Sequence, residues 1–220
     1  MPTVFITGAN RGIGLAFAQS YAASGWRVLA TCRAPEKAGA LKAVKGDVAV
    51  HALEVTDEAQ LAALAKSLSE ETIDVLINNA GVGGGESTEA WLRTLHINCI
   101  APIRIAQALL PLVLRSERKV IASITSGMGS IGDNTSGGSY AYRSSKAALN
   151  AAMKSLSVDL AKRGASVIVI NPGWVRTDMG GAGARMTAAD SVARMRKVID
   201  SAGPAQNGKF YNYDGAEYPW

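Results

Sequence analysis

Cysteine and histidine are scarce in this sequence of 220 residues, which has only two of each. Cys32 and Cys99 have no second cysteine pair and no histidine at metal-ligand spacing, so we expect neither a disulfide framework nor a metal site. His51 falls in an expected strand and His96 has no suitably spaced partner, so both are interpreted as structural. The sparing use of cysteine favours a reducing compartment, and we expect a cytoplasmic protein.

Long apolar runs and clustered charge are also missing. No window of about 18 uninterrupted apolar residues is present, and the N-terminus "MPTVFITGAN" lacks the charged start of a secretory leader, so we expect no membrane partner. The net charge is +5, but the basic residues are scattered, and "RSERK" (115–119) already contains Glu117. Without an aromatic and basic platform, nucleic-acid binding is not expected.

What the sequence does have is a repeated alternation of short apolar runs and longer amphipathic stretches, with no linker dividing it. This pattern predicts β-α units in one domain, residues 1–220. Strands are expected at 3–7, 27–32, 48–55, 73–78, 119–125 and 165–171, and helices at 12–24, 57–69, 91–115 and 142–163, where Pro102 and Pro111 would kink or shorten the third helix. The fold class is α/β, a doubly wound and mainly parallel sheet of the Rossmann type with helices on both faces.

A glycine-rich turn, "TGANRGIG", follows the first expected strand and opens a helix, with glycines at 8, 12 and 14. Such a turn lets the backbone approach a pyrophosphate at the helix N-terminus. Because no lysine followed by serine or threonine ends the motif, a dinucleotide is favoured over a P-loop nucleotide site. A second loop, "NNAG" (78–81), lies beyond the fourth strand, so both loops point to one crevice at the carboxyl ends of the strands.

The stretch "YAYRSSK" (140–146) places Tyr142 four positions before Lys146, which puts both on one face of a helix, whereas Tyr140 points elsewhere. A nearby ammonium stabilises a phenolate and lowers the pKa of the phenol, so this tyrosine would act as an acid or base near neutral pH. The alternative interpretation is an ordinary tyrosine at the start of a helix followed by a solvated lysine.

Four motifs, "TGANRGIG", "NNAG", "YRSSK" and "NPGWVRTDM", occur in the order found in classical short-chain dehydrogenases/reductases, and the sequence resembles that family over almost its whole length. The stretch "DNTSGGSYAYRSSKAALN" and the ending "YDGAEYPW" further resemble the sniffer/C-factor-like carbonyl reductase branch. The resemblance implies that Tyr142 is the general acid of carbonyl reduction, that Lys146 lowers its pKa and holds the nicotinamide ribose, and that Asn98 holds a water in a proton relay.

The resemblance also implies an active-site serine just after the fifth strand, where "SITSGMGSI" places Ser126, with Ser123 and Ser130 as rivals. Ser126 precedes Tyr142 by slightly more than the usual separation, and the glycine-rich residues 132–138 would absorb the difference or shape the pocket. The 180–190 segment, rich in glycine and alanine, is expected to be a mobile substrate loop.

The resemblance assigns a set of residues to the cofactor: Gly8, Asn10, Arg11, Gly12, Ile13, Gly14, Arg33, Glu54, Val55, Asn79, Ala80, Gly81, Tyr142, Lys146, Pro172, Gly173, Val175 and Thr177. NAD-binding relatives carry an acidic residue at the end of the second strand, where this sequence has Cys32 followed by Arg33. A guanidinium binds a 2′-phosphate that a carboxylate would repel, and Arg11 could approach from the other side, so the expected cofactor is NADP(H).

The expected function is NADPH-dependent reduction of a small aldehyde or ketone. The alternatives are an NAD-dependent alcohol dehydrogenase of the same family and a dinucleotide-binding signalling protein without turnover. The family implies a homodimer or homotetramer that pairs through the helices at about 91–115 and 142–163. The C-terminal stretch "YDGAEYPW" is expected to pack beside the substrate crevice and to favour apolar carbonyl compounds. The alternative is that its aromatic residues are anchored in the core far from the crevice.

Overall fold

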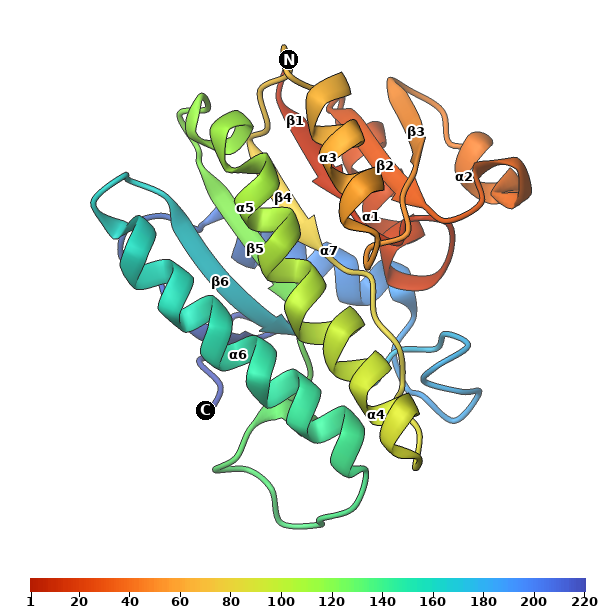
Figure 1. Ribbon diagram of the computed structural model, residues 1–220, viewed down its shortest axis with the longest axis vertical. Helices are drawn as coiled ribbons and strands as arrows, with labels where there is room; N and C mark the ends of the chain where they lie inside the picture. The colour runs from red at the N-terminus through yellow and green to blue at the C-terminus, as the bar shows by residue number, and fades with distance from the viewer.

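The computed structural model describes residues 1–220 and contains one sheet with helices on both faces (Figure 1). The strands are β1 (Thr3–Ile6), β2 (Arg27–Cys32), β3 (Val48–Ala52), β4 (Val75–Asn78), β5 (Val120–Ile124), β6 (Ser166–Asn171) and β7 (Phe210–Asn212). They lie in the order β3-β2-β1-β4-β5-β6-β7, and every neighbouring pair is parallel. The order reverses between β1 and β4, and this confirms the predicted doubly wound sheet.

The helices divide between the two faces of the sheet (Figure 1). They are α1 (Gly12–Ala23), α2 (Gly39–Lys42), α3 (Glu58–Ser67), α4 (Thr88–Leu95), α5 (Ala101–Leu114), α6 (Tyr140–Ala161) and α7 (Ala188–Asp200). In β1, Val4 and Ile6 belong to the core under α1 and α7, and Phe5 belongs to the core under α3, α5 and α6. Successive side chains of a strand point to opposite faces, so a fully apolar strand fills both cores.

Two elements near the C-terminus were not predicted. Thr187 caps α7, since its hydroxyl accepts from the backbone N–H of Asp190 at 3.1 Å, and the helix buries Val192 and Met195 against α1 and the sheet. The expected mobile loop at 180–190 therefore ends at Thr187. The other element, β7, has only three residues and directly precedes the tail "YDGAEYPW".

The expected helix at 91–115 is interrupted. It consists of α4, a single π turn (His96–Ile100) and α5. Pro102 lies at the start of α5, where its missing N–H costs little, and Pro111 lies inside α5. The combined stretch Thr88–Leu114 is long and apolar enough to cross a membrane by length and composition, but half of its most apolar window is buried inside the fold, as in an ordinary core helix.

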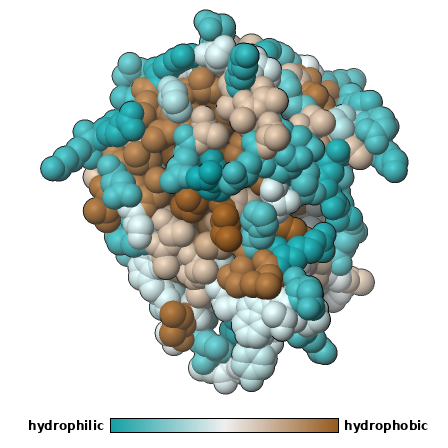
Figure 2. Space-filling view, viewed as in Figure 1, coloured by the Kyte–Doolittle hydropathy of each residue, from teal (hydrophilic) through white to brown (hydrophobic).

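The face of the molecule formed by α4, α5 and α6 carries apolar side chains at its centre and upper left, within a polar rim (Figure 2). Leu92 on α4, Ile100 in the π turn and Val158 on α6 are all exposed. The pairing of two copies through these helices stays a prediction.

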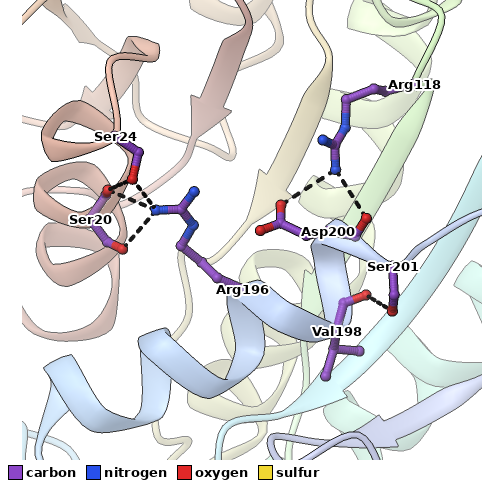
Figure 3. A network of polar contacts seen from close by, with 7 residues as sticks. All are labelled: Ser20, Ser24, Arg118, Arg196, Val198, Asp200 and Ser201. Atoms are coloured by element: carbon purple, nitrogen blue, oxygen red, sulfur yellow. Dashed lines mark hydrogen bonds and ion pairs between the residues drawn. The ribbon is translucent and has the colours of Figure 1, made fainter.

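A polar network fixes α7 to the neighbouring elements (Figure 3). Arg196 donates to the backbone oxygen of Ser20 at 2.8 Å and to the hydroxyls of Ser20 at 3.1 Å and Ser24 at 2.9 Å. Its guanidinium also lies 4.2 Å from the centre of the Tyr21 ring. One partly buried arginine thus joins the predicted α1 to the unpredicted α7.

We expect Arg196→Ala to destabilise the protein by about 2 kcal/mol, because charged hydrogen bonds and a cation–π contact are lost together. The measurement is urea unfolding followed by circular dichroism. The matched control is Lys197→Ala, which removes an exposed side chain from the same helix turn and should change stability by less than about 0.5 kcal/mol. Equal stability of the two variants would show that the network contributes nothing.

Candidate active site

The first turn of the chain and the loop after β4 meet at backbone distance. Asn79 donates its side-chain N–H to the backbone oxygens of Thr7 at 2.9 Å and Gly8 at 3.1 Å. In return, the hydroxyl of Thr7 accepts from the backbone N–H groups of Asn79 at 3.0 Å and Ala80 at 3.1 Å. Thr7 was not among the predicted residues, although its place at the end of β1 next to the glycine turn would have suggested it.

Glycine is required in this turn for two different reasons. Gly8 and Gly12 have φ values of +65° and +55°, in the left-handed region. Gly14 has no unusual φ, but a Cβ there would lie 2.3 Å from the oxygen of Gly8 and 2.5 Å from Nδ2 of Asn79. The glycine at position 14 thus permits the contact that closes the floor of the crevice.

A cavity of about 770 Å³ lies along the carboxyl ends of the strands, within the size range of sites for small molecules and cofactors. It is lined by every residue predicted for the cofactor, and also by Ser126, Tyr142 and Lys146. Among the predicted site residues only Asn98 does not line it. The lining also includes residues that sequence reasoning missed, among them Val82, Arg93, Thr125, Met128, Trp174, Asp178 and Met179.

Asn98 is fully buried in the π turn, behind the cavity wall. Its amide accepts from the N–H of Val82 and donates to the oxygen of Val82, both at 2.9 Å, and it donates to the hydroxyl of Ser145 at 3.0 Å. The side chain therefore holds the loop after β4 against α6. Its role in a proton relay stays a prediction.

The three candidate serines occupy different environments. Ser123 is buried in β5, where its hydroxyl accepts from Asn78 at 3.2 Å. Ser130 donates to the backbone oxygen of Trp220 at 3.2 Å. Only Ser126 lines the cavity, and its hydroxyl accepts from the backbone N–H of Met128 at 3.1 Å. The geometry thus favours Ser126 over both rivals.

Tyr142 differs electrostatically from the expectation. Burial raises the pKa of its phenol, and a hydrogen bond with Ser126 opposes that rise. The ammonium of Lys146 lies 5.9 Å from the centre of the Tyr142 ring and donates to the backbone oxygen of Ile124 at 2.9 Å instead of to the phenol. The predicted lowering of the Tyr142 pKa by Lys146 is therefore not seen, and the phenol is protonated at neutral pH.

Lys146 has an unusual environment for a lysine, because only 5% of its surface is exposed. Burial lowers the pKa of its ammonium to about 8, and the weak attraction of Cys99 only partly opposes this. The hydroxyl of Thr125 lies nearby on the same cavity wall, buried and without a hydrogen-bond partner. Buried polar groups are normally paired, so these two groups fit a polar ligand in this part of the cavity.

The two arginines predicted to hold a phosphate have different partners. Arg11 forms an ion pair with Asp178 at 2.6 Å, and both side chains are largely exposed. Arg33 is exposed at the end of β2, lines the cavity and has no acidic partner. The glycine turn, the loop after β4 and the free guanidinium of Arg33 together fit a phosphorylated dinucleotide. Glu54 bonds to the N–H and hydroxyl of Thr56, so its carboxylate is engaged locally.

The C-terminal tail does not line the cavity. Tyr218 and Trp220 pack on Phe210 of β7, with ring centres 5.0 Å and 5.6 Å apart from it. The tail thus packs beside the cavity, since Tyr218 lies against Gly127 of the turn that follows Ser126, but its rings do not line the cavity, and β7 anchors them. A preference of the tail for apolar carbonyl compounds stays a prediction.

The family model described as short chain dehydrogenase matches residues 2–187. This chain belongs to the short-chain dehydrogenase/reductase family. Members of the family are oxidoreductases that bind a nicotinamide dinucleotide and act on small molecules. The catalytic and cofactor roles of the glycine turn, the loop after β4 and the Tyr142–Lys146 pair stay predictions.

Two curated relatives cover different shares of the chain. The C-signal of Myxococcus xanthus is 46% identical over 164 residues, which span 72% of this chain and 99% of that protein. The 1-hydroxy-2-glutathionyl-2-methyl-3-butene dehydrogenase of Rhodococcus sp. (strain AD45) is 34% identical over 231 residues and spans 100% of both.

Solved structures of the family are also similar to this chain. Carbonyl reductase Sniffer of D. melanogaster superposes with a TM-score of 0.94 at 34% identity, with 100% of both chains covered. An NADPH-bound carbonyl reductase from chicken fatty liver gives a TM-score of 0.92 at 33% identity, covering 100% of this chain and 94% of that one.

The lowered pKa of Lys146 makes a prediction for this dehydrogenase/reductase. A lysine with a pKa of about 8 when folded and about 10.5 when unfolded binds fewer protons in the folded state between these values. The burial of Lys146 therefore lowers the free energy of unfolding by its full amount below pH 8, and this destabilisation diminishes as the pH rises toward 10.5. Lys146→Met removes this destabilisation, so its advantage in unfolding free energy over the wild type should shrink by about 1–2 kcal/mol between pH 7 and pH 9.5.

Urea unfolding at the two pH values measures this difference. Lys162→Met, at the exposed C-terminal end of the same helix, is the control for the loss of a lysine that is not buried. If the difference in unfolding free energy between Lys146→Met and the wild type is the same at both pH values, the lowered pKa of Lys146 is contradicted.

Proposed function

We propose that this protein is an NADPH-dependent reductase of aldehydes or ketones, with Tyr142 as the proton donor. The observation that carries the proposal is the convergence of Ser126, Tyr142 and Lys146 on the cavity that the glycine turn and the loop after β4 also line. When bound, the cofactor would supply a hydride. The residues of the chain must then hold the carbonyl group and deliver a proton to its oxygen.

Each of the three side chains has a definite part in this mechanism. Ser126 donates a hydrogen bond to the carbonyl oxygen and holds it next to the phenol. Tyr142, whose raised pKa keeps it protonated, gives its proton to that oxygen as negative charge develops there. The Lys146 ammonium, buried close to the tyrosine ring, stabilises the phenolate that remains and would hold the cofactor ribose.

Apolar carbonyl compounds are the proposed substrates. The reason lies in the side chains that line the cavity and not in the C-terminal tail. Trp174, Met179 and Met128 line the cavity, and the first two remain largely exposed. Exposed apolar side chains at the rim of a cavity favour an apolar ligand, since its binding would remove them from water.

The alternative of a signalling protein without turnover is favoured by one observation, the 46% identity to the C-signal of Myxococcus xanthus. Oxidation of NADPH by purified protein across a panel of apolar aldehydes and ketones separates the two functions. Turnover of any of them supports the reductase, and binding of NADPH with no turnover supports the alternative.

Tyr142→Phe should lower kcat by at least about 10²-fold, because it removes the proton donor while leaving the ring in place. The affinity for NADPH, measured by fluorescence titration, should change little. Tyr140→Phe is the control, because this exposed tyrosine lies two positions away and does not line the cavity. Full activity of Tyr142→Phe would remove it from the mechanism.

Arg33→Ala tests the choice of cofactor. Because a charged hydrogen bond contributes about 1.5–3 kcal/mol, the dissociation constant for NADPH should rise by at least about tenfold. The dissociation constant for NADH, which lacks the 2′-phosphate, should stay within about twofold and serves as the control. Adding Arg11→Ala should weaken NADPH further if Arg11 leaves Asp178 for the phosphate. Equally tight binding of NADH and NADPH by the wild type would favour the NAD-dependent alternative.

A further inference from the structure

The turn that carries Ser126 has little rigidity of its own. Ser126 has an extended backbone and precedes the 3-10 turn η3 (Gly127–Gly129), which contains two glycines. Glycine restricts the backbone less than any other residue, so the position of Ser126 depends on what packs against the turn. Both sides of the turn are in close contact with other parts of the chain.

On one side the turn rests on α6. A Cβ added to Gly129 would lie 2.9 Å from the backbone carbon and the Cβ of Lys146. Asn150, one helical turn further along α6, donates to the oxygen of Gly129 at 3.2 Å. This contact ties the turn to the helix that carries Tyr142 and Lys146.

On the other side the turn rests on the C-terminal tail. A Cβ added to Gly127 would lie 2.8 Å from the hydroxyl oxygen of Tyr218 and 3.2 Å from the ring carbon that bears it. The same hydroxyl donates to the carboxylate of Asp133 at 2.7 Å. The backbone N–H of Tyr218 donates to the oxygen of Phe210 at 2.8 Å, so β7 supports the ring from behind.

The end of the tail holds the segment that follows the turn. The backbone oxygen of Trp220 accepts from the N–H groups of Ile131 at 3.0 Å and Gly132 at 2.8 Å, and from the hydroxyl of Ser130 at 3.2 Å. Residues 130–133 are thereby fixed to β7 through the tail, and the turn is clamped between α6 and Tyr218.

We propose that Tyr218 is a positioning residue, which sets the place of the Ser126 hydroxyl opposite Tyr142 by packing on Gly127 and bonding to Asp133. Tyr218 does not line the cavity, so it acts on the substrate only through Ser126. This inference rests on the proposed reductase function. Displacement of a catalytic group by about 1 Å can lower turnover by up to about 10²-fold.

The first test is kinetic. Tyr218→Ala should lower kcat for carbonyl reduction by about tenfold and leave the KM for NADPH within about twofold, because the cofactor residues lie elsewhere in the cavity. Tyr218→Phe, which keeps the ring and loses the hydroxyl, should lie between this variant and the wild type. Tyr211→Phe is the matched control. It also removes a tyrosine hydroxyl at this edge of the sheet, but the Tyr211 hydroxyl forms no hydrogen bond. Unchanged kcat in both Tyr218 variants would overturn the proposal.

The second test asks whether the effect passes through Ser126. In a Ser126→Ala background there is no hydroxyl to position, so adding Tyr218→Ala should lower kcat by less than about twofold. A full tenfold loss in that background would overturn the proposal, because it would show that Tyr218 acts by another route or only through general stability.

The third test does not depend on turnover. The crystal structure of Tyr218→Phe is compared with that of the wild type. In the variant, the Ser126 hydroxyl should be displaced relative to Tyr142 or occupy two positions, with α6 unchanged. An unchanged Ser126 would overturn the positioning role. If the wild type reduces no carbonyl compound, the proposed function fails, and this comparison still decides whether Tyr218 positions the turn.

Discussion

The close backbone contact between the turn after β1 and the loop after β4 is the constraint on which the rest of the site depends. Asn79 reaches across to the oxygens of Thr7 and Gly8, and any side chain at position 14 would occupy the same space. Because β1 and β4 are neighbours at the point where the strand order reverses, this contact forms the floor of the cavity. The same loop is held from behind by Asn98, so the floor and the helical wall form one connected unit.

Much of this arrangement could be predicted from the sequence. Apolar strands that are buried on both faces, such as "TVFI" in β1, have an obvious pattern, and the motifs that follow them have fixed places in a parallel sheet. Hence most of the sheet and most helices were predicted, and every residue that was predicted for the cofactor lines the cavity. The residues of the motifs lie close to strand ends, where local sequence and topology agree.

The failures have physical causes that a local pattern does not contain. The segment "AADSVARMRKVID" has a low apolar content, although Val192, Met195 and Ile199 lie on one buried face. Its stability as α7 comes from contacts with α1 nearly 180 residues earlier, including those of Arg196 with Ser20. A three-residue strand such as β7 is defined by its partner β6 rather than by its own composition. The pKa of Tyr142 was misjudged because the spacing of Tyr142 and Lys146 indicates proximity, whereas burial and the bond from Lys146 to Ile124 depend on the whole fold.

The π turn at His96–Ile100 has a geometric consequence for the helices on either side. Each residue of a helix advances the side-chain direction by about 100°, so one extra residue in a turn rotates everything before it relative to everything after it. The apolar stripe of α5 can therefore face the sheet while Asn98 points inward toward the loop after β4. Shortening the π turn by one residue would keep both helices intact and yet turn α4 by about a quarter of a revolution, which would remove Trp91 from its bond with Ser144. The contact between α4 and α6 is thus set by the number of residues in the π turn that precedes α5.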